Sequence, residues 1–153
     1  MKIEQKLAEM GWPLHETQKP AGVYVPALRV GDMVYTSGQG VRREGGKDIR
    51  GKLGREVSIE DGYLAARYCI LNCLSAIKGV IGDLDKIERI VKVLGFVNSA
   101  AGFDQQPKVI NGASELLAEV FGENGVGARS AIGVNELPNG TAVEIEIIVK
   151  VKD

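Results

Sequence analysis

The chain has 153 residues, of which 44% are hydrophobic and 25% charged, and its formal net charge is −1. Length and composition fit one globular domain, residues 1–153, with a sizeable core. The near-neutral charge argues against a nucleic-acid partner, because such binders present a basic excess or stripe. The N-terminus lacks the apolar core of a signal peptide, and no stretch approaches ~18 uninterrupted apolar residues. We therefore expect a cytoplasmic protein without a membrane span.

The first third of the chain predicts a short helix and two strands. Residues 1–10 carry apolar residues at helical spacing, within an N-terminal extension that covers residues 1–20. Residues 23–30 and 33–40 have the pattern of two strands of a hairpin, joined by a Gly-Asp dipeptide. Residues 41–56 mix basic residues with glycine and acidic residues, which predicts a strand end and a long exposed loop.

The rest of the chain predicts two longer helices and three strands. Ser58 followed by Asp61 resembles a capping box, and it opens the longest helical pattern, which ends near Gly82. A second helix starts near Pro107 and ends near Gly122. The strands are expected at residues 87–99, 128–136 and 141–152. The last two are predicted to form a hairpin, since Asn139-Gly140 between them favours a tight turn with positive φ.

This order predicts an α+β fold, in which two helices cover one face of a mixed sheet. In the last strand Val143, Ile145, Ile147, Val149 and Val151 share the face that should meet the helices. The opposite face carries Ile148 among charged residues, and the neighbouring strand adds small and apolar residues to it. Such a face is better explained by contact with another subunit than by water, so we expect a homo-oligomer.

Cys69 and Cys73 lie one helical turn apart within an apolar pattern, and the only histidine, His15, is distant in sequence. A structural zinc site needs four such ligands. We interpret both cysteines as small core residues and expect no metal.

Arg129 and Glu144 are the strongest candidate site residues. Arginine at the mouth of an apolar strand is either a solvated charge or a clamp for a carboxylate, which its planar fork meets bidentately. For Glu144 the same two interpretations stand. The predicted hairpin places both side chains on one face, ~14–20 Å apart, which argues against a direct salt bridge within one chain.

Two segments, "GDMVYTSGQG" (31–40) and "GARSAIGVNELPNGTAVEIEIIVKV" (127–151), resemble the RidA (YjgF/YER057c/UK114) family. That family shows a TSGQ motif early and an ARS…LP…VEIE signature near its C-terminal end. The resemblance covers roughly residues 20–151, with the blocks in the same order. It is nearest to the longer branch, described as chorismate-mutase-like or as endoribonuclease.

The resemblance implies a chorismate-mutase-like fold, a homotrimer with a central barrel, and clefts at the subunit interfaces. Characterised members hydrolyse enamines and imines to 2-oxo acids and ammonia, with neither metal nor organic cofactor. The family arginine that grips the substrate carboxylate corresponds to Arg129, and the glutamate that activates water corresponds to Glu144. The residues that match the cleft lining are Tyr24, Ser37, Gly38, Asn111 and Ala131. Ala131 stands where the family often has cysteine, which excludes a thiol role there.

Three other functions remain open at this point. A trimer with this site could bind a small carboxylate, such as a 2-oxo acid, without turnover. A chorismate-mutase-type isomerase would need further arginines against a dicarboxylate. An endoribonuclease would need paired acid and base groups, and the single histidine and neutral charge argue against it.

Overall fold

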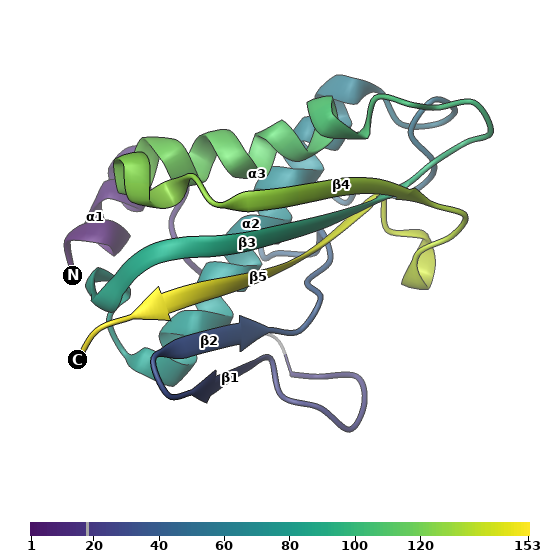
Figure 1. Cartoon of the computed structure of the whole chain (residues 1–153). Helices are drawn as coiled ribbons and strands as arrows, with labels where there is room; N and C mark the ends of the chain where they lie inside the picture. Colours follow the sequence, from purple (N-terminus) through teal and green to yellow (C-terminus); the bar gives the residue numbers. More distant parts are fainter. Residues whose placement is uncertain (18) are drawn as a thin grey trace.

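The computed structural model describes residues 1–17 and 19–153, and it folds these into one five-stranded sheet with two long helices on one face (Figure 1). The strands are β1 (Ala27–Val30), β2 (Met33–Thr36), β3 (Ile87–Asn98), β4 (Ala128–Val134) and β5 (Val143–Val151). The helices are α1 (Lys2–Glu9), α2 (Ile59–Ile81) and α3 (Gln106–Phe121). Short 3-10 turns span Leu84–Lys86, Gly122–Gly125 and Pro138–Gly140. The α+β class with a mixed sheet is confirmed.

The strand order is β1-β2-β5-β3-β4, so β3 lies between the last two strands. β5 pairs antiparallel with β2 and β3, whereas β4 pairs parallel with β3. The predicted hairpin of residues 128–136 and 141–152 is therefore wrong. Its turn chemistry is present, since Asn139 and Gly140 have φ values of 57° and 71°. The turn instead lies in a connection that passes β3, which pairs with β4 on one edge and with β5 on the other.

The predicted helix boundaries follow from local chemistry. The Ser58 hydroxyl accepts a hydrogen bond from the backbone N–H of Asp61 at 3.0 Å, which satisfies one free donor at the start of α2. Gly82 ends that helix with a φ of 83°, a value that favours glycine. Pro107 occupies the first turn of α3, and Gly122 follows its last residue.

The core lies between the sheet and helices α2 and α3. The five alternating apolar residues of β5 are all buried against the helices, as the alternation predicts. Cys69 and Cys73 are buried core residues of α2, as expected. Among the described residues α2 alone is long and apolar enough to span a bilayer, but 72% of the relevant stretch is buried inside the domain. That burial is typical of a core helix.

Residues 41–56 are not the freely exposed loop that the composition suggested. Val41, Ile49 and Leu53 are buried, and they pin the segment across the end of the sheet. Backbone bonds add to this anchoring, because Arg50 pairs with Thr141 in a short antiparallel bridge. The charged residues between the apolar ones are thereby held at defined positions.

The sheet face opposite α2 and α3 carries exposed apolar side chains in the single chain. Register places Leu28, Tyr35 and Ile148 beside one another across β1, β2 and β5. The most exposed large apolar residues on this face are Leu28 (55%), Val30 (59%), Tyr35 (43%) and Ile132 (44%). This is the face for which the sequence predicts a subunit contact.

Candidate functional site

A cavity of about 400 Å³ lies at the end of the sheet, beside the start of β5. Its walls come from four segments that are distant in sequence, residues 19–26, 38–42, 48–50 and 138–144, and from Asn72 of α2. Three of the predicted site residues line it, namely Tyr24, Gly38 and Glu144. The cavity is thus the part of the surface where the TSGQ segment and the VEIE segment meet.

Glu144 lies half-buried on the open face of β5, beside the chain that leaves β2. Hydrogen bonds join Gln39 to Ile145, with N–O distances of 2.8 and 3.0 Å, so the segment around Gly38 runs next to Glu144. Burial, and to a smaller degree the negative charge of Glu146, raises the pKa of the Glu144 carboxyl above its usual range. A carboxylate with a raised pKa, next to a cavity, suits the role of a general base.

Ser37 and Tyr24 shape the rim of the cavity. The Ser37 hydroxyl donates to the carbonyl of Val25 at 2.6 Å, and the Ser37 N–H donates to the carbonyl of Pro26 at 2.8 Å. These bonds hold the chain that carries Tyr24 against the TSGQ segment. Ser37 itself does not line the cavity among the described residues, so its visible role is to fix that chain.

Arg129 and Asn111 form a second group between β4 and α3. The Arg129 Nη1 atom donates to Asn111 Oδ1 at 2.7 Å and to Ser114 Oγ at 3.3 Å. Ala131 follows two residues later on the same face of β4, where it pairs with Gly95 and packs against the core. Arg129 is exposed, with its guanidinium oriented by two neutral acceptors and no carboxylate contact among the described residues.

Within one chain the two groups lie apart, on opposite faces of the sheet. Arg129 pairs with Val93, which pairs with Ile147 on the helix-covered face, whereas Glu144 pairs with Phe96 on the open face. Two strand spacings and three residues separate them, or ~14 Å between Cα atoms. The prediction that both share a face is wrong, because it relied on the hairpin, and the intervening β3 changes the parity of the register.

Sequence reasoning missed several cavity residues, chiefly Lys19, Arg42, Asp48, Arg50 and Asn72. The Asn72 amide donates to the carbonyls of Gly40 and Arg42, at 3.0 and 2.8 Å, and so ties the cavity wall to α2. The spacing of Val41, Ile49 and Leu53 was the available signal. Buried apolar residues within a basic segment indicate that its charges are positioned.

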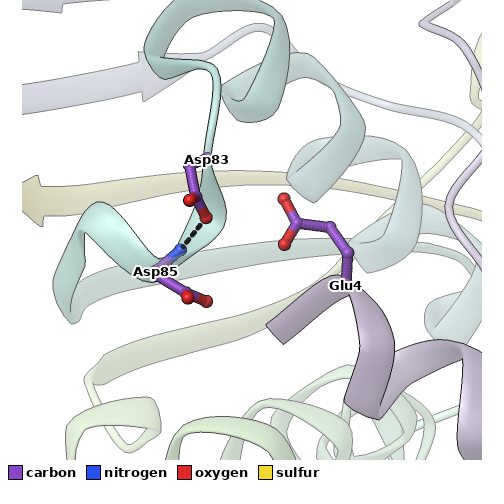
Figure 2. A group of neighbouring side chains, drawn as sticks. All are labelled: Glu4, Asp83 and Asp85. Atoms are coloured by element: carbon purple, nitrogen blue, oxygen red, sulfur yellow. Dashed lines mark hydrogen bonds between the residues drawn. The ribbon is translucent and has the colours of Figure 1, made fainter. Parts of the chain in front are cut away.

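A separate group of carboxylates lies where α1 meets the turn before β3, and Figure 2 shows its members converging: Glu4, Asp83 and Asp85. Their candidate ligand atoms lie within 4.8 Å of one another, close enough for a metal. Glu4 Oε2 is buried without a hydrogen-bond partner among the described residues, whereas Glu4 Oε1 accepts the backbone N–H of Leu84 at 3.1 Å and the aspartates have partners within the chain. Asp85 accepts the backbone N–H groups of Lys2 and Ile3 at 2.9 Å, and the Met1 ammonium lies 3.2 Å from it. We assign this group the role of anchoring α1.

Comparison with known proteins identifies the family. The model of the family described as "YjgF/chorismate mutase-like, putative endoribonuclease" matches residues 4–144. Protein TCP17 of Trypanosoma cruzi is 38% identical over 153 residues, which cover 99% of this chain and 96% of that protein. A 2-iminobutanoate/2-iminopropanoate deaminase of Dermatophagoides farinae is 30% identical over 135 residues, which cover 88% of this chain and 90% of that protein.

Among solved structures, the Agrobacterium tumefaciens protein Atu1372 superposes with a TM-score of 0.90 at 41% identity. The superposition covers 99% of this chain and 94% of that one. The family model, the sequence relatives and the fold agree, and the chain belongs to the YjgF/chorismate mutase-like family.

Proposed function

We propose that this protein is an imine deaminase, which hydrolyses 2-imino acids to 2-oxo acids and ammonia at clefts between the subunits of a homotrimer. One observation carries the proposal. The oriented guanidinium of Arg129 and the carboxylate of Glu144 lie on opposite faces of one sheet, ~14 Å apart. They act on one small molecule only if two copies of the chain bring them together. The exposed apolar residues of the open face supply a surface for that contact.

The chemistry follows from what each group can do. Arg129 binds the substrate carboxylate bidentately and places the C=N carbon beside Glu144. The Glu144 carboxylate takes a proton from water, and the water oxygen adds to the C=N carbon while the nitrogen gains a proton. The Glu144 carboxylate then carries the hydroxyl proton of the carbinolamine to the nitrogen, the C–N bond breaks with release of ammonia, and the C–O bond becomes the carbonyl of the 2-oxo acid. One water is consumed and one ammonia released.

The direct test measures ammonia release from imines that an amino-acid oxidase generates in situ. Arg129→Ala should lose the acceleration through loss of substrate placement, and Glu144→Ala should lose roughly 10²–10⁴-fold through loss of the base. The name of the Dermatophagoides farinae relative supports this choice of substrate. Binding of 2-oxo acids by a folded protein that accelerates no imine would instead favour a non-catalytic binding protein.

Complementation tests the shared cleft. Arg129→Ala and Glu144→Ala subunits are each inactive alone, but a mixed trimer contains sites with one intact contribution from each neighbour. Random mixing in equal amounts should restore about a quarter of the wild-type activity, since each site needs two independent intact contributions. Mixed oligomers that stay inactive would contradict a site built from two chains.

A further inference from the structure

Three cationic side chains line the cavity beside Glu144, and the proposed chemistry uses none of them. Lys19, Arg42 and Arg50 line it, opposed by Asp48 and by Glu144 itself. An adjoining hollow of about 190 Å³ shares three of these residues and adds Arg43 and Lys47. A substrate with one imino group and one carboxylate does not need these cations, because in the proposed mechanism Arg129 already binds its carboxylate.

The backbone of Arg50 is fixed by hydrogen bonding to a neighbouring segment. It forms an antiparallel bridge with Thr141, and the N–H of Gly51 donates to the carbonyl of Gly140 at 2.8 Å. Thr141 precedes Glu144 by three residues, or ~10 Å along the strand. The base and this arginine therefore line one cavity, with Glu144 on β5 and Arg50 paired to the segment that leads into β5.

The Arg50 side chain is 62% exposed and, within the part of the chain that the structure describes, is paired only at Nε, which leaves it able to bind an anion. Its Nε atom lies 3.3 Å and 3.1 Å from the two carboxylate oxygens of Asp48. Its two terminal nitrogens have no partner among the described residues. An arginine fixed through Nε still presents both terminal N–H₂ groups, and a carboxylate can bind them bidentately.

Arg43 lines only the adjoining hollow, and its guanidinium is held by the rest of the chain. Its guanidinium lies 5.4 Å from the centre of the Tyr68 ring, and its Nη2 atom donates to the carbonyl of Pro13 at 2.8 Å. Its Nη1 atom is buried and has no hydrogen-bond partner among the described residues. Because protein atoms cover this nitrogen, it is not open to a ligand in the hollow, and Arg50 remains the arginine placed to bind an anion.

We propose that the substrate carries a second anionic group, and that Arg50, with Arg42 and Lys19, binds it. The site then prefers 2-imino acids with an acidic side chain, such as the imine of glutamate. A side chain of two or three carbons places its carboxylate roughly 4–5 Å from the reacting carbon. The arginine side chain covers the remaining distance. This inference rests on the proposed imine hydrolysis and names its substrate class.

The test compares the imines of glutamate and methionine, which have side chains of similar length and differ in charge. Amino-acid oxidases generate both in situ, and kcat/KM is measured for each. We expect the wild type to favour the glutamate imine by about tenfold or more, the value of one charge-assisted bidentate pair. Arg50→Gln should reduce that ratio toward one. The matched control is Arg55→Gln, because Arg55 belongs to the same segment, is paired with Glu56 and lies outside the cavity.

The outcomes separate this inference from the function on which it rests. Wild-type protein that hydrolyses both imines equally, or an unchanged ratio in Arg50→Gln, overturns the acidic-substrate inference and leaves the deaminase intact. If neither imine is hydrolysed, the deaminase fails. Calorimetric binding of 2-oxoglutarate against the 2-oxo acid of methionine then tests the same pocket. Equal affinities for the two 2-oxo acids overturn the inference. It is also overturned if the protein shows no preference between them but binds single-stranded RNA, and Arg50→Gln abolishes that RNA binding.

Discussion

The carboxylate of Glu144 lies directly over the α-carbon of Gly38. A Cβ atom placed on Gly38 would come within 2.5 Å of Glu144 Oε2 and 2.8 Å of its Cδ atom. Real side chains do not approach this closely, so the position has room for the Glu144 carboxyl only because residue 38 is glycine. The TSGQ segment thus sets where the proposed base can stand.

Gly38→Ala should therefore reduce imine hydrolysis at least tenfold, toward the level of a Glu144 variant, because the methyl group displaces the base from its position. The measurement is kcat with in-situ imines, beside a thermal melt. Gly40→Ala is the matched control. A Cβ atom there meets Thr141 Oγ1 at 3.7 Å, an ordinary contact. Equal activity of the two variants would show that the carboxylate position is unimportant.

Asn111→Ala should weaken substrate binding more than turnover. Its Oδ1 atom holds Arg129 Nη1 at 2.7 Å, so its removal frees the guanidinium to adopt other rotamers. We expect KM to rise roughly three- to tenfold, the value of a lost neutral or charge-assisted hydrogen bond. Ser114→Ala, which removes the longer 3.3 Å contact, should have the smaller effect. A larger fall in kcat than rise in KM would place Asn111 in the chemical step.

Local rules predicted the elements well, and long-range pairing is where they failed. The Ser58 cap, the glycines at both helix ends and the alternation in β5 each depend on a few neighbouring residues. Strand order depends on which strand edges pair with each other, and a hairpin between two strands adjacent in sequence is only the most local of the possible pairings. The parallel pairing of β3 with β4 overrides it, although Asn139-Gly140 adopts the turn conformation that suggested a hairpin.

The candidate site was predictable as a set of residues but not as an arrangement. Motifs identified Gly38, Glu144 and Arg129, and the structure places the first two in contact. The separation of Arg129 from Glu144 follows from the pairing of β4 and β5 with the intervening β3, and no local sequence pattern encodes that pairing. The placement of Arg50 at the cavity was hidden because a basic segment is usually solvated, whereas buried Ile49 and Leu53 fix the backbone of this one.

The pH–rate profile should reflect the raised pKa of Glu144. A general base works when ionised, so kcat/KM should fall on the acid side at a higher pH than an ordinary carboxyl would give. Glu146 adds to the raised pKa through its negative charge. Glu146→Gln should therefore move the acid limb to lower pH. A limb that stays in place would assign the ionisation to the substrate or to another group.

The same ionisation should cost stability. Because the pKa of Glu144 is higher in the folded protein than in the unfolded chain, the folded state binds more protons between the two values. Stability then decreases as pH rises through that window. Glu144→Gln should thus be at least as stable as the wild type at neutral pH, although inactive. Urea unfolding at pH 4 and pH 7 measures the difference, and a variant much less stable at pH 7 would contradict the expectation.

Asp85 should make the attachment of α1 sensitive to acid. Backbone N–H groups of Lys2 and Ile3 lower its pKa from 3.8 to about 2. A lowered pKa means that its contribution is present above the unfolded value and is lost as pH falls from about 4 to about 2. Hydrogen exchange of α1 should accelerate in that range, and Asp85→Asn should show fast exchange already at pH 7. Asp83→Asn, which leaves both N–H bonds to Asp85, is the control.

Lys52 should be the charged residue whose loss destabilises the domain most. Its ammonium is almost fully buried, and it donates to Asn98 Oδ1 at 3.0 Å and to the carbonyl of Asn135. It also lies 3.2 Å from the carboxylate of Glu136. Lys52→Met leaves the buried Asn98 amide oxygen without this donor, at ~1–3 kcal/mol for an unsatisfied buried group, and it also removes the bond to the partly exposed carbonyl of Asn135.

The control for Lys52 is Glu136→Gln, which removes the exposed partner of the same ion pair. Its side chain is 65% exposed, against 11% for that of Lys52, so an exposed pairing of this kind contributes little. Urea unfolding of both variants separates the buried hydrogen bonds from the ion pair. Equal losses in the two variants would mean that the ion pair holds the segment before β5. A loss confined to Lys52→Met would mean that the hydrogen bonds of Lys52 hold that segment. Lys52→Met should then also lower activity, because the segment before β5 forms a wall of the cavity.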